Sequence, residues 1–313
     1  MGISNTEIEK MNSFQEGSYL YRSSWFQLMR PLTFSGTISP ILAGTAVASL
    51  YAPIRWDIFF VMIIAALIVQ ATANMFNDYF DFKHGQDAEK WKDTDERSGN
   101  EPAHHHIPYT AIGMLCIAII LGVWLSIQSS WWVALIGSIS IVFGYLYSAG
   151  KHSLSALGFG ELTAAVFLGF VTTILSFVVQ GHAVDGFILA VALTFAMLIS
   201  TMILSNNIRD LKKDRGFRNT LPMKLGRKNA ARLLSVLLIS IYAWAIFLVI
   251  IQVVPWTAIL SLFAIPVALR LCWSYRLKAA RQEEIKGMKW AAYHHWTFGL
   301  LFAIGIGAGA FML

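Results

Sequence analysis

Nine apolar stretches, each about twenty residues long, restrict this chain to one class of fold. A helix of about twenty residues crosses the hydrocarbon layer of a bilayer. None of the stretches has the alternation of polar and apolar residues that is typical of a membrane β-barrel, and a lipid-facing backbone outside a barrel must bond to itself as a helix. The sequence therefore predicts an all-α, polytopic membrane protein with nine transmembrane helices in one bundle. The predicted helices lie at residues 33–51, 57–80, 108–129, 131–149, 157–180, 183–207, 231–252, 254–272 and 290–312.

The rest of the sequence leaves no room for a second domain. Of its 313 residues, 56% are apolar and only 13% are charged, which is too little polar surface for a soluble globule of this size. We expect a single transmembrane domain over residues 1–313, with an N-terminal arm at 1–32 and two cap loops at 81–107 and 209–231. The lipid-facing residues carry no information about the oligomeric state.

The distribution of basic residues predicts the orientation in the membrane. If the N-terminus is cytoplasmic, every Lys and Arg except Arg55 falls in a cytoplasmic arm, loop or helix end, as the positive-inside rule requires. The N-terminal arm and both cap loops are then on the cytoplasmic side of the cell membrane. The formal net charge of +6 follows from loops that lie on an anionic lipid leaflet, so it does not indicate a nucleic-acid partner.

One pattern of an amide followed by two acids occurs twice, each time where an apolar stretch ends. Its members are Asn74, Asp78 and Asp81 in the first copy and Asn206, Asp210 and Asp214 in the second. The spacings of four and then seven or eight residues predict that each trio shares one helix face. Both copies lie at the C-terminal ends of their helices, where the helix dipole disfavours negative charge, so we expect cations to compensate them.

The residue types in these two patterns indicate a magnesium and diphosphate site. Carboxylates are hard ligands, and Mg²⁺ typically binds a few carboxylates together with substrate phosphates. The predicted metal ligands are Asp78, Asp81, Asp210 and Asp214. Basic residues near the second pattern are suited to phosphate oxygens; they are Arg209, Lys213 and Arg218, and Lys151 is another candidate. A purely structural role, in which the acids face solvent at helix ends, remains open.

Two sequence motifs resemble those of a known family. NDYFDFKHGQD (Asn77–Asp87) and NNIRDLKKDR (Asn206–Arg215) resemble the aspartate-rich motifs of the UbiA superfamily of intramembrane aromatic prenyltransferases. Within it, they are most similar to 1,4-dihydroxy-2-naphthoate polyprenyltransferases of menaquinone biosynthesis. The 4-hydroxybenzoate branch usually has Arg and an acid where this chain has Phe82 and Gly85. Further similarities are RP (Arg30–Pro31), YSAGK (Tyr147–Lys151), GFGE (Gly158–Glu161) and RNTLPMKLG (Arg218–Gly226).

The resemblance implies a reaction and a set of site residues. It implies Mg²⁺-dependent transfer of a polyprenyl group from an allylic polyprenyl diphosphate to 1,4-dihydroxy-2-naphthoate, with loss of diphosphate and CO₂, giving demethylmenaquinol. The expected catalytic residues are Asp78, Asp81, Asp210, Asp214 and Lys151. The expected substrate-binding residues are Asn74, Asn77, Asn206, Asn207, Arg209, Lys213, Arg218, Tyr147 and Arg30. For Glu161, structural and functional roles are equally open.

Two alternatives remain at this stage. The acceptor is open to replacement by 4-hydroxybenzoate, homogentisate or a tetrapyrrole, because the acceptor choice depends on the weaker flanking residues. A cation-coupled secondary transporter is less favoured, since the acids lie at helix ends beside Arg and Lys rather than at broken helix centres. The run His104–His106 is not expected to bind a metal, because consecutive side chains cannot all point one way.

Overall fold

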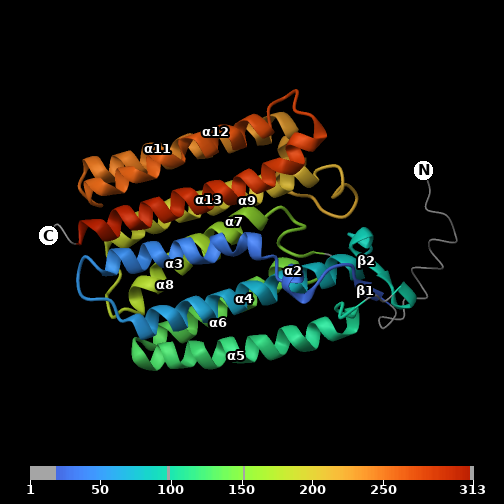
Figure 1. Cartoon of the computed structure of the whole chain (residues 1–313), viewed down its shortest axis with the longest axis horizontal. Helices are drawn as coiled ribbons and strands as arrows, with labels where there is room; N and C mark the ends of the chain where they lie inside the picture. The colour runs from blue at the N-terminus through green and yellow to red at the C-terminus, as the bar shows by residue number, and fades with distance from the viewer. Residues whose placement is uncertain (1–18, 97–98, 151, 311–313) are drawn as a thin grey trace.

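Long helices lie side by side in one bundle (Figure 1). The structure is a computed structural model that describes residues 19–96, 99–150 and 152–310. The predicted Lys151 and the first part of the N-terminal arm, residues 1–18, therefore lie outside the described residues. The longest helices are α3 (Ser35–Ala48), α4 (Trp56–Lys83), α5 (Ile107–Gln128), α6 (Trp131–Ser148), α9 (Gly186–Asp210), α11 (Arg227–Ile250) and α13 (Arg281–Gly309).

Two of the expected helices are built from several pieces. The first consists of α7 (Gly160–Ala164), the π-helical η5 (Ala165–Val171) and α8 (Thr172–Val178). The second joins the 3₁₀-helical η6 (Trp256–Ala264) to α12 (Ile265–Ser274). In both cases the chain stays helical, so its backbone groups remain bonded within the segment, as a lipid environment requires.

Seven helical segments of the described chain are long and apolar enough to cross a membrane, which confirms the prediction of an all-α, polytopic protein. They are Trp56–Lys83, His104–Gln128, Trp131–Ser148, Gly160–Val178, Gly186–Asp210, Arg227–Ile250 and Trp256–Ser274. The other two predicted stretches overlap α3, which has 14 residues, and α13, which begins with a charged segment.

Small residues let the central helices approach one another closely. A Cβ added to Gly299 of α13 would lie 2.5 Å from the Cβ of Ser39 on α3. A Cβ on Gly44 of α3 would lie 2.2 Å from the backbone oxygen of Thr173 on α8. Such contacts provide van der Waals packing between helices where lipid removes any hydrophobic driving force.

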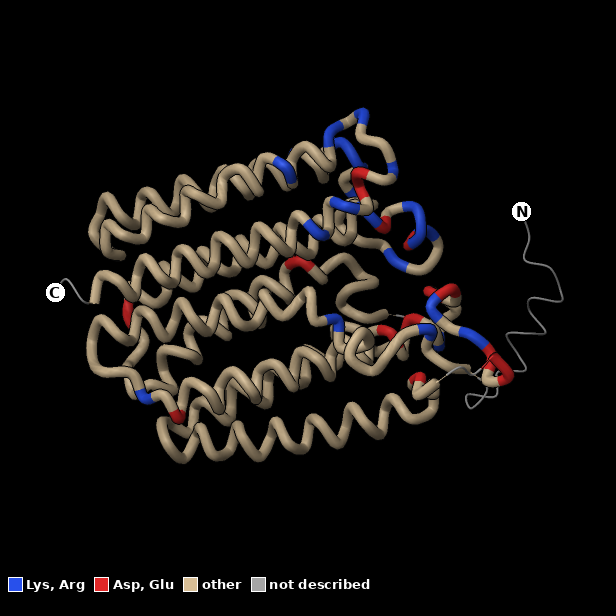
Figure 2. The backbone as a smooth tube through the Cα atoms, in the orientation of Figure 1, with Lys and Arg blue, Asp and Glu red and all other residues tan. Residues whose placement is uncertain are grey.

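One end of the bundle carries the loops and most of the charge. Figure 2 shows that Lys and Arg gather there, while few occur at the opposite end. We call this the basic end. It holds the short elements β1 (Tyr19–Tyr21), α2 (Trp25–Leu28), η1 (Pro31–Phe34), η2 (Ala88–Lys90), β2 (Trp91–Asp93), η3 (Thr94–Glu96), η4 (His104–His106) and α10 (Leu221–Leu225).

A small antiparallel sheet at the basic end was not predicted. β1 pairs with β2, with Tyr19 opposite Asp93 and Tyr21 opposite Trp91. The sheet joins the segment before the first helix to the loop after α4. Three-residue strands carry too little periodicity to be recognised in a sequence, and their pairing joins residues about seventy positions apart.

The helix-face prediction is right for the first pattern and wrong for one residue of the second. Asn74, Asp78 and Asp81 all lie on α4. In contrast, α9 ends at Asp210, so Asp214 lies in the turn that follows. The Asp214 amide still donates to the Asp210 carbonyl at 2.9 Å, but the chain does not continue as a helix. Gly216, with a φ of +95°, turns it away.

Candidate active site

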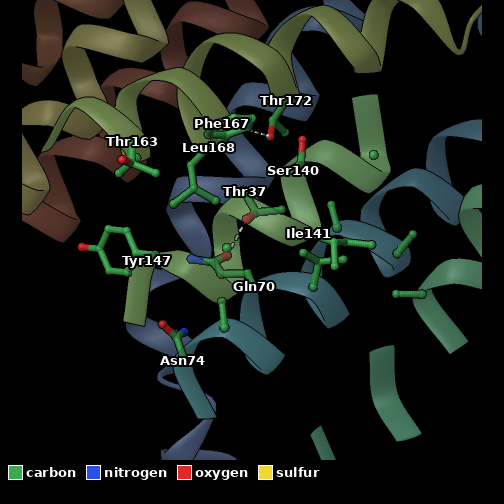
Figure 3. A pocket seen from close by; sticks show the side chains of 18 of the residues that line it. Thr37, Gln70, Asn74, Ser140, Ile141, Tyr147, Thr163, Phe167, Leu168 and Thr172 are labelled. Carbon is green, nitrogen blue, oxygen red and sulfur yellow. Dashed lines mark hydrogen bonds between the residues drawn. The ribbon is translucent and has the colours of Figure 1, made fainter. Parts of the chain in front are cut away.

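A partly open cavity of about 320 Å³ lies between α4, α5, α6, α9 and the composite α7–η5–α8 segment. Figure 3 shows polar side chains of its wall, among them Gln70 and Thr37, which are hydrogen-bonded to each other. Deeper inside, the wall is apolar, with residues such as Met62, Leu125 and Val133. Its polar lining includes seven residues predicted as substrate-binding, namely Arg30, Asn74, Asn77, Tyr147, Asn206, Asn207 and Arg218.

Three acids gather at the end of α4. Asp78 and Asp81 lie on its last turns, and Asp87 follows in the loop. Gly85 has a φ of +81° and Asp87 a φ of +60°, and this left-handed turn folds the loop back toward the helix. One carboxylate oxygen from each of the three acids lies within 4.8 Å of the others. We call Asp78, Asp81 and Asp87 the first carboxylate cluster.

Cations from other segments compensate Asp78, the most buried acid of this cluster. Asp78 is fully buried. Its Oδ1 is 2.7 Å from Arg30 Nη2 and 2.6 Å from Lys90 Nζ. Tyr21 also donates its hydroxyl to Asp78, at 3.5 Å. The contacts with Arg30 and Lys90 confirm that cations compensate an acid placed at a helix C-terminus.

The other two acids of the cluster are paired in the same way. Arg218 donates to Asp81. Asp87 contacts Lys213 as well as Lys90, whose Nζ is 2.5 Å from Asp87 Oδ2. Burial by itself would raise the pKa of Asp87, but the two ammonium groups overcome it and lower the pKa to about 2. Asp87 is therefore ionised at any physiological pH.

The second pattern, Asn206, Asp210 and Asp214, is held differently. Asp210 pairs with its own neighbour Arg209 at 2.5 Å, and Arg209 also donates to Asn206 Oδ1 at 2.7 Å. Asp214 is 3% exposed and accepts a hydrogen bond from the neutral amide of Gln86 at 2.7 Å. Burial is the main reason why the pKa of Asp214 rises to about 6, and the negative charges of Asp210, Asp81 and Asp87 add to it against the opposing Arg218.

Three side chains, those of Gln86, Arg218 and Lys213, join the loops that follow α4 and α9. Gln86 donates to Asp214, while its Oε1 accepts from Arg218 Nε at 3.1 Å. Arg218 in turn donates to Asp81. Lys213, from the loop after α9, reaches Asp87 and Glu89 of the other loop. The ends of α4 and α9 therefore meet at one place, beside the polar part of the cavity.

Amide side chains in and next to the two patterns hold the helices together. Asn74 donates to the Met29 carbonyl at 2.8 Å, and Asn77 donates to Ser148 Oγ at 3.2 Å. Asn207 donates to Glu161 Oε1 at 2.8 Å. These contacts fix the amide planes at the cavity wall.

The first carboxylate cluster fits a hard divalent cation. Its three acids offer oxygen ligands only, which suits Mg²⁺ better than a soft transition metal. Asp210 and Asp214, which the sequence also predicts as metal ligands, do not share this close grouping. Asp214 is linked to it through Gln86 and Arg218, whereas the side chain of Asp210 contacts Arg209.

Sequence reasoning missed several residues of this site. Asp87 lies within the first motif but is not among the predicted ligands. An acid two residues after Gly85 is nevertheless a signal for a turn that brings the chain back toward the helix. Lys90 and Gln86 had no recognisable signal, because their roles depend on contacts that the folded loop creates.

Comparisons with known proteins agree with this architecture. Residues 37–298 match the UbiA prenyltransferase family. A 1,4-dihydroxy-2-naphthoate octaprenyltransferase of Bacillus subtilis (strain 168) is 33% identical, over 90% of this chain and 91% of that protein. The protein with the same description from Mycobacterium tuberculosis (strain ATCC 25618 / H37Rv) is 29% identical, over 84% of this chain and 89% of that protein.

Solved structures show the same fold at low sequence identity. A UbiA homologue from Archaeoglobus fulgidus bound to DMAPP and Mg²⁺ has a TM-score of 0.61 and 13% identity, covering 90% of this chain and all of that one. A UbiA homologue from Aeropyrum pernix K1 has a TM-score of 0.63 and 14% identity, covering 91% of this chain and 99% of that one. With a family match over most of its length and a relative of 33% identity, the chain belongs to the UbiA prenyltransferase family.

Proposed function

We propose that the protein transfers a polyprenyl group from an allylic polyprenyl diphosphate to 1,4-dihydroxy-2-naphthoate, releasing diphosphate and CO₂ and giving demethylmenaquinol. The observation that carries this proposal is a single cavity whose polar end is lined by residues of both aspartate motifs and whose other end is apolar. The naphthoate acceptor is supported by the description of the relative that is 33% identical.

The polar end of the cavity is suited to a diphosphate. Arg30, Lys90 and Arg218 already contact the carboxylates there, and Arg30 and Arg218 line the cavity. Guanidinium groups bind phosphate oxygens in pairs of parallel hydrogen bonds. These cations can therefore use some of their N–H groups to bind the diphosphate while others stay paired with the carboxylates.

Mg²⁺ is the metal that the donor set fits. Asp78 and Asp81 would hold it, with Asp87 in the same group and Asp210 and Asp214 approaching from the other motif. When bound, Mg²⁺ neutralises the charge that develops on the departing diphosphate. The protein's own contribution is to place this charge beside Arg30 and Arg218 in a buried site, where electrostatic stabilisation is strong.

The apolar part of the cavity is suited to an isoprenoid tail. On α4 its lining runs from Asn77 to Met62, a length of about 22 Å at the rise of an α-helix. The apolar wall also excludes water from the allylic cation that forms when the C–O bond breaks, so transfer to the aromatic ring is favoured over hydrolysis. The ring attacks through its carboxyl-bearing carbon.

The charge distribution supports a cytoplasmic site. The basic end carries the site and most Lys and Arg residues (Figure 2), while Arg55 lies before α4 at the opposite end. The positive-inside rule then assigns the N-terminus and the site to the cytoplasm. Counting α3 and α13 with the seven candidate spans gives the nine spans that we propose.

An acceptor panel tests the proposed function. Purified protein is incubated with Mg²⁺, a labelled allylic diphosphate, and dihydroxynaphthoate, 4-hydroxybenzoate or homogentisate. We expect diphosphate release and prenylated product with dihydroxynaphthoate, and loss of both when EDTA removes the metal. Preference for 4-hydroxybenzoate or homogentisate contradicts the acceptor assignment, and the absence of transfer to any of the three contradicts the reaction class.

A further inference from the structure

Glu161 is a buried acid with an unused oxygen. It lies in the first turn of α7 and is 7% exposed. Its Oε1 accepts from Asn207, whereas its Oε2 is buried without a hydrogen-bond partner among the described residues. An ionisable group inside a membrane-spanning segment is costly to bury and marks a functional site by default. The buried, unpartnered Oε2 therefore indicates that a ligand binds to it.

Glu161 lies beside the cavity wall and is not itself among the residues that line it. Thr163 and Ala164, which follow it on α7, do line the cavity (Figure 3 shows Thr163).

Two residues that do line the cavity lie next to Glu161. Asn207, the partner of Glu161, lines the cavity from α9. Tyr147 lines it from α6, and its hydroxyl lies 3.4 Å from the position of a Cβ added to Gly160, next to Glu161. Three helices therefore bring an acid, an amide and a phenol to one side of the polar end.

We propose that Glu161, oriented by Asn207, is the base that accepts the proton of the acceptor's ring hydroxyl. The inference rests on the proposed function and adds a catalytic residue to it. As Glu161 Oε2 takes the hydroxyl proton, the ring carbon next to the C–OH carbon forms its bond to the allylic carbon. The allylic C–O bond breaks, and its electron pair leaves with the diphosphate.

The second half of the reaction restores Glu161. The ring oxygen is now a ketone beside the carbon that carries both the prenyl group and the carboxylate. Loss of CO₂ returns the electron pair of the broken C–C bond to the ring, and the resulting oxyanion takes the proton back from Glu161. Neither an oxidant nor another co-reactant is needed, and the carboxylate is regenerated in each turnover.

The other acids of the site are poorer proton acceptors. Asp78, Asp81 and Asp87 each contact a Lys or Arg side chain, and Asp210 is paired with Arg209. A carboxylate that is engaged by a cation is less available to accept a proton. Asp214, which accepts a hydrogen bond from the neutral Gln86, is a proposed metal ligand and would be engaged by the bound cation. Glu161 has no ion pair of this kind among the described contacts, and the cation that acts on it through space, Lys224, donates to the Leu157 carbonyl.

The test compares Glu161→Gln with wild type. Gln keeps the shape and an oxygen that accepts from Asn207 but has no basicity. We expect kcat to fall about 10²- to 10³-fold, within the usual range for a lost general base, with an unchanged KM for the polyprenyl diphosphate. Glu283→Gln, at the start of α13 and paired with Arg276, is the matched control and should retain the wild-type rate.

A series of acceptors separates a base from a structural residue. Naphthoates with progressively more acidic ring hydroxyls lose the proton more easily without a base. The loss of kcat in Glu161→Gln relative to wild type should therefore become smaller along the series. A wild-type rate in Glu161→Gln, or an equal deficit with every acceptor, overturns the assignment. Glu161→Asp, which keeps a carboxylate, should retain at least about a tenth of the wild-type rate, and an equally slow Asp variant also overturns it. If wild type itself transfers nothing, the proposed function fails instead.

Discussion

The two aspartate motifs look equivalent in the sequence but are held by different kinds of contact. The acids of the first carboxylate cluster are each paired with Lys or Arg from other segments. In the second motif, Asp210 pairs with an adjacent Arg, and Asp214 accepts from a neutral amide. The first motif is therefore stabilised as a charged unit by the tertiary structure, whereas Asp214 is buried without an ion pair and its pKa is raised.

The first carboxylate cluster is therefore expected to support the folded structure of the site, and Asp214 is expected to act in ligand binding. Removing a charge from the first cluster leaves buried cations uncompensated, which damages both the fold and the site. Removing the charge of Asp214 relieves an unfavourable burial and should therefore stabilise the metal-free fold. Three substitutions test this contrast, ordered from the largest expected effect to the smallest.

Asp78→Asn should have the largest effect. It removes the shared partner of Arg30 and Lys90 and one proposed metal ligand, so we expect prenyl transfer to fall at least about 10³-fold, the upper range for the loss of one electrostatic contact. Product formation under saturating donor and Mg²⁺ measures it. Transfer at more than a tenth of the wild-type rate would show that this carboxylate is dispensable.

Arg218→Gln should have an intermediate effect. Arg218 contacts Asp81 and Gln86 and thereby joins the two motifs. We expect kcat/KM for the diphosphate to fall about 10²-fold, the range for losing about 3 kcal/mol of a charge-assisted contact. Arg218→Lys should recover little of this, because an ammonium cannot reproduce two directed contacts. Full recovery with Lys would show that charge alone matters.

Asp214→Asn should have the smallest effect on the fold, measured as the thermal stability of the metal-free protein. Because burial raises the pKa of Asp214 to about 6, the folded state favours the protonated form. The stabilisation from this group is present below its ordinary pKa and is lost as the pH rises through about 6. In metal-free protein at pH 7.5, the permanently neutral Asn should therefore raise Tm by a few degrees.

The pH dependence and the first cluster provide the controls for this measurement. The gain from Asp214→Asn should disappear as the pH approaches 4, where the wild-type side chain is neutral as well. Asp78→Asn should lower Tm at pH 7.5, opposite in sign, because it leaves Arg30 and Lys90 without their partner. Equal shifts in Tm for both variants would show that the two motifs do not differ in how their acids are stabilised.

Much of the fold could be predicted because hydrophobic length carries the information. Most of the apolar stretches mark the helices to within a few residues, as for 57–80 and the observed α4 at Trp56–Lys83. The exception is 290–312, because α13 already begins at Arg281 with a charged segment that carries no apolar signal. Cationic compensation of the acids also follows from helix polarity alone. Placing Asp214 on α9 failed, because the end of a helix depends on the turn after it, here at Gly216.

The site could be predicted only in part. The sequence marks which residues are costly to bury, so the amides and arginines of the cavity wall were found. It does not show which partners they meet. The contacts of Lys90 with Asp78 and of Gln86 with Asp214 depend on how two loops fold over the bundle. The catalytic, metal and substrate roles of these residues stay predictions.

The π-helical η5 has a consequence for how residues along this helix can change. A π-turn accommodates one residue more than an α-turn, and η5 lies between Glu161 and the cavity-lining Leu175. Deleting a single residue within Ala165–Val171 would let the segment rewind as α-helix. Because the wider turn already holds one residue more, the parts before and after it would keep nearly the same orientation. A one-residue deletion should therefore be tolerated there, whereas the same deletion in an unbroken α-helix would rotate one part against the other by about 100°.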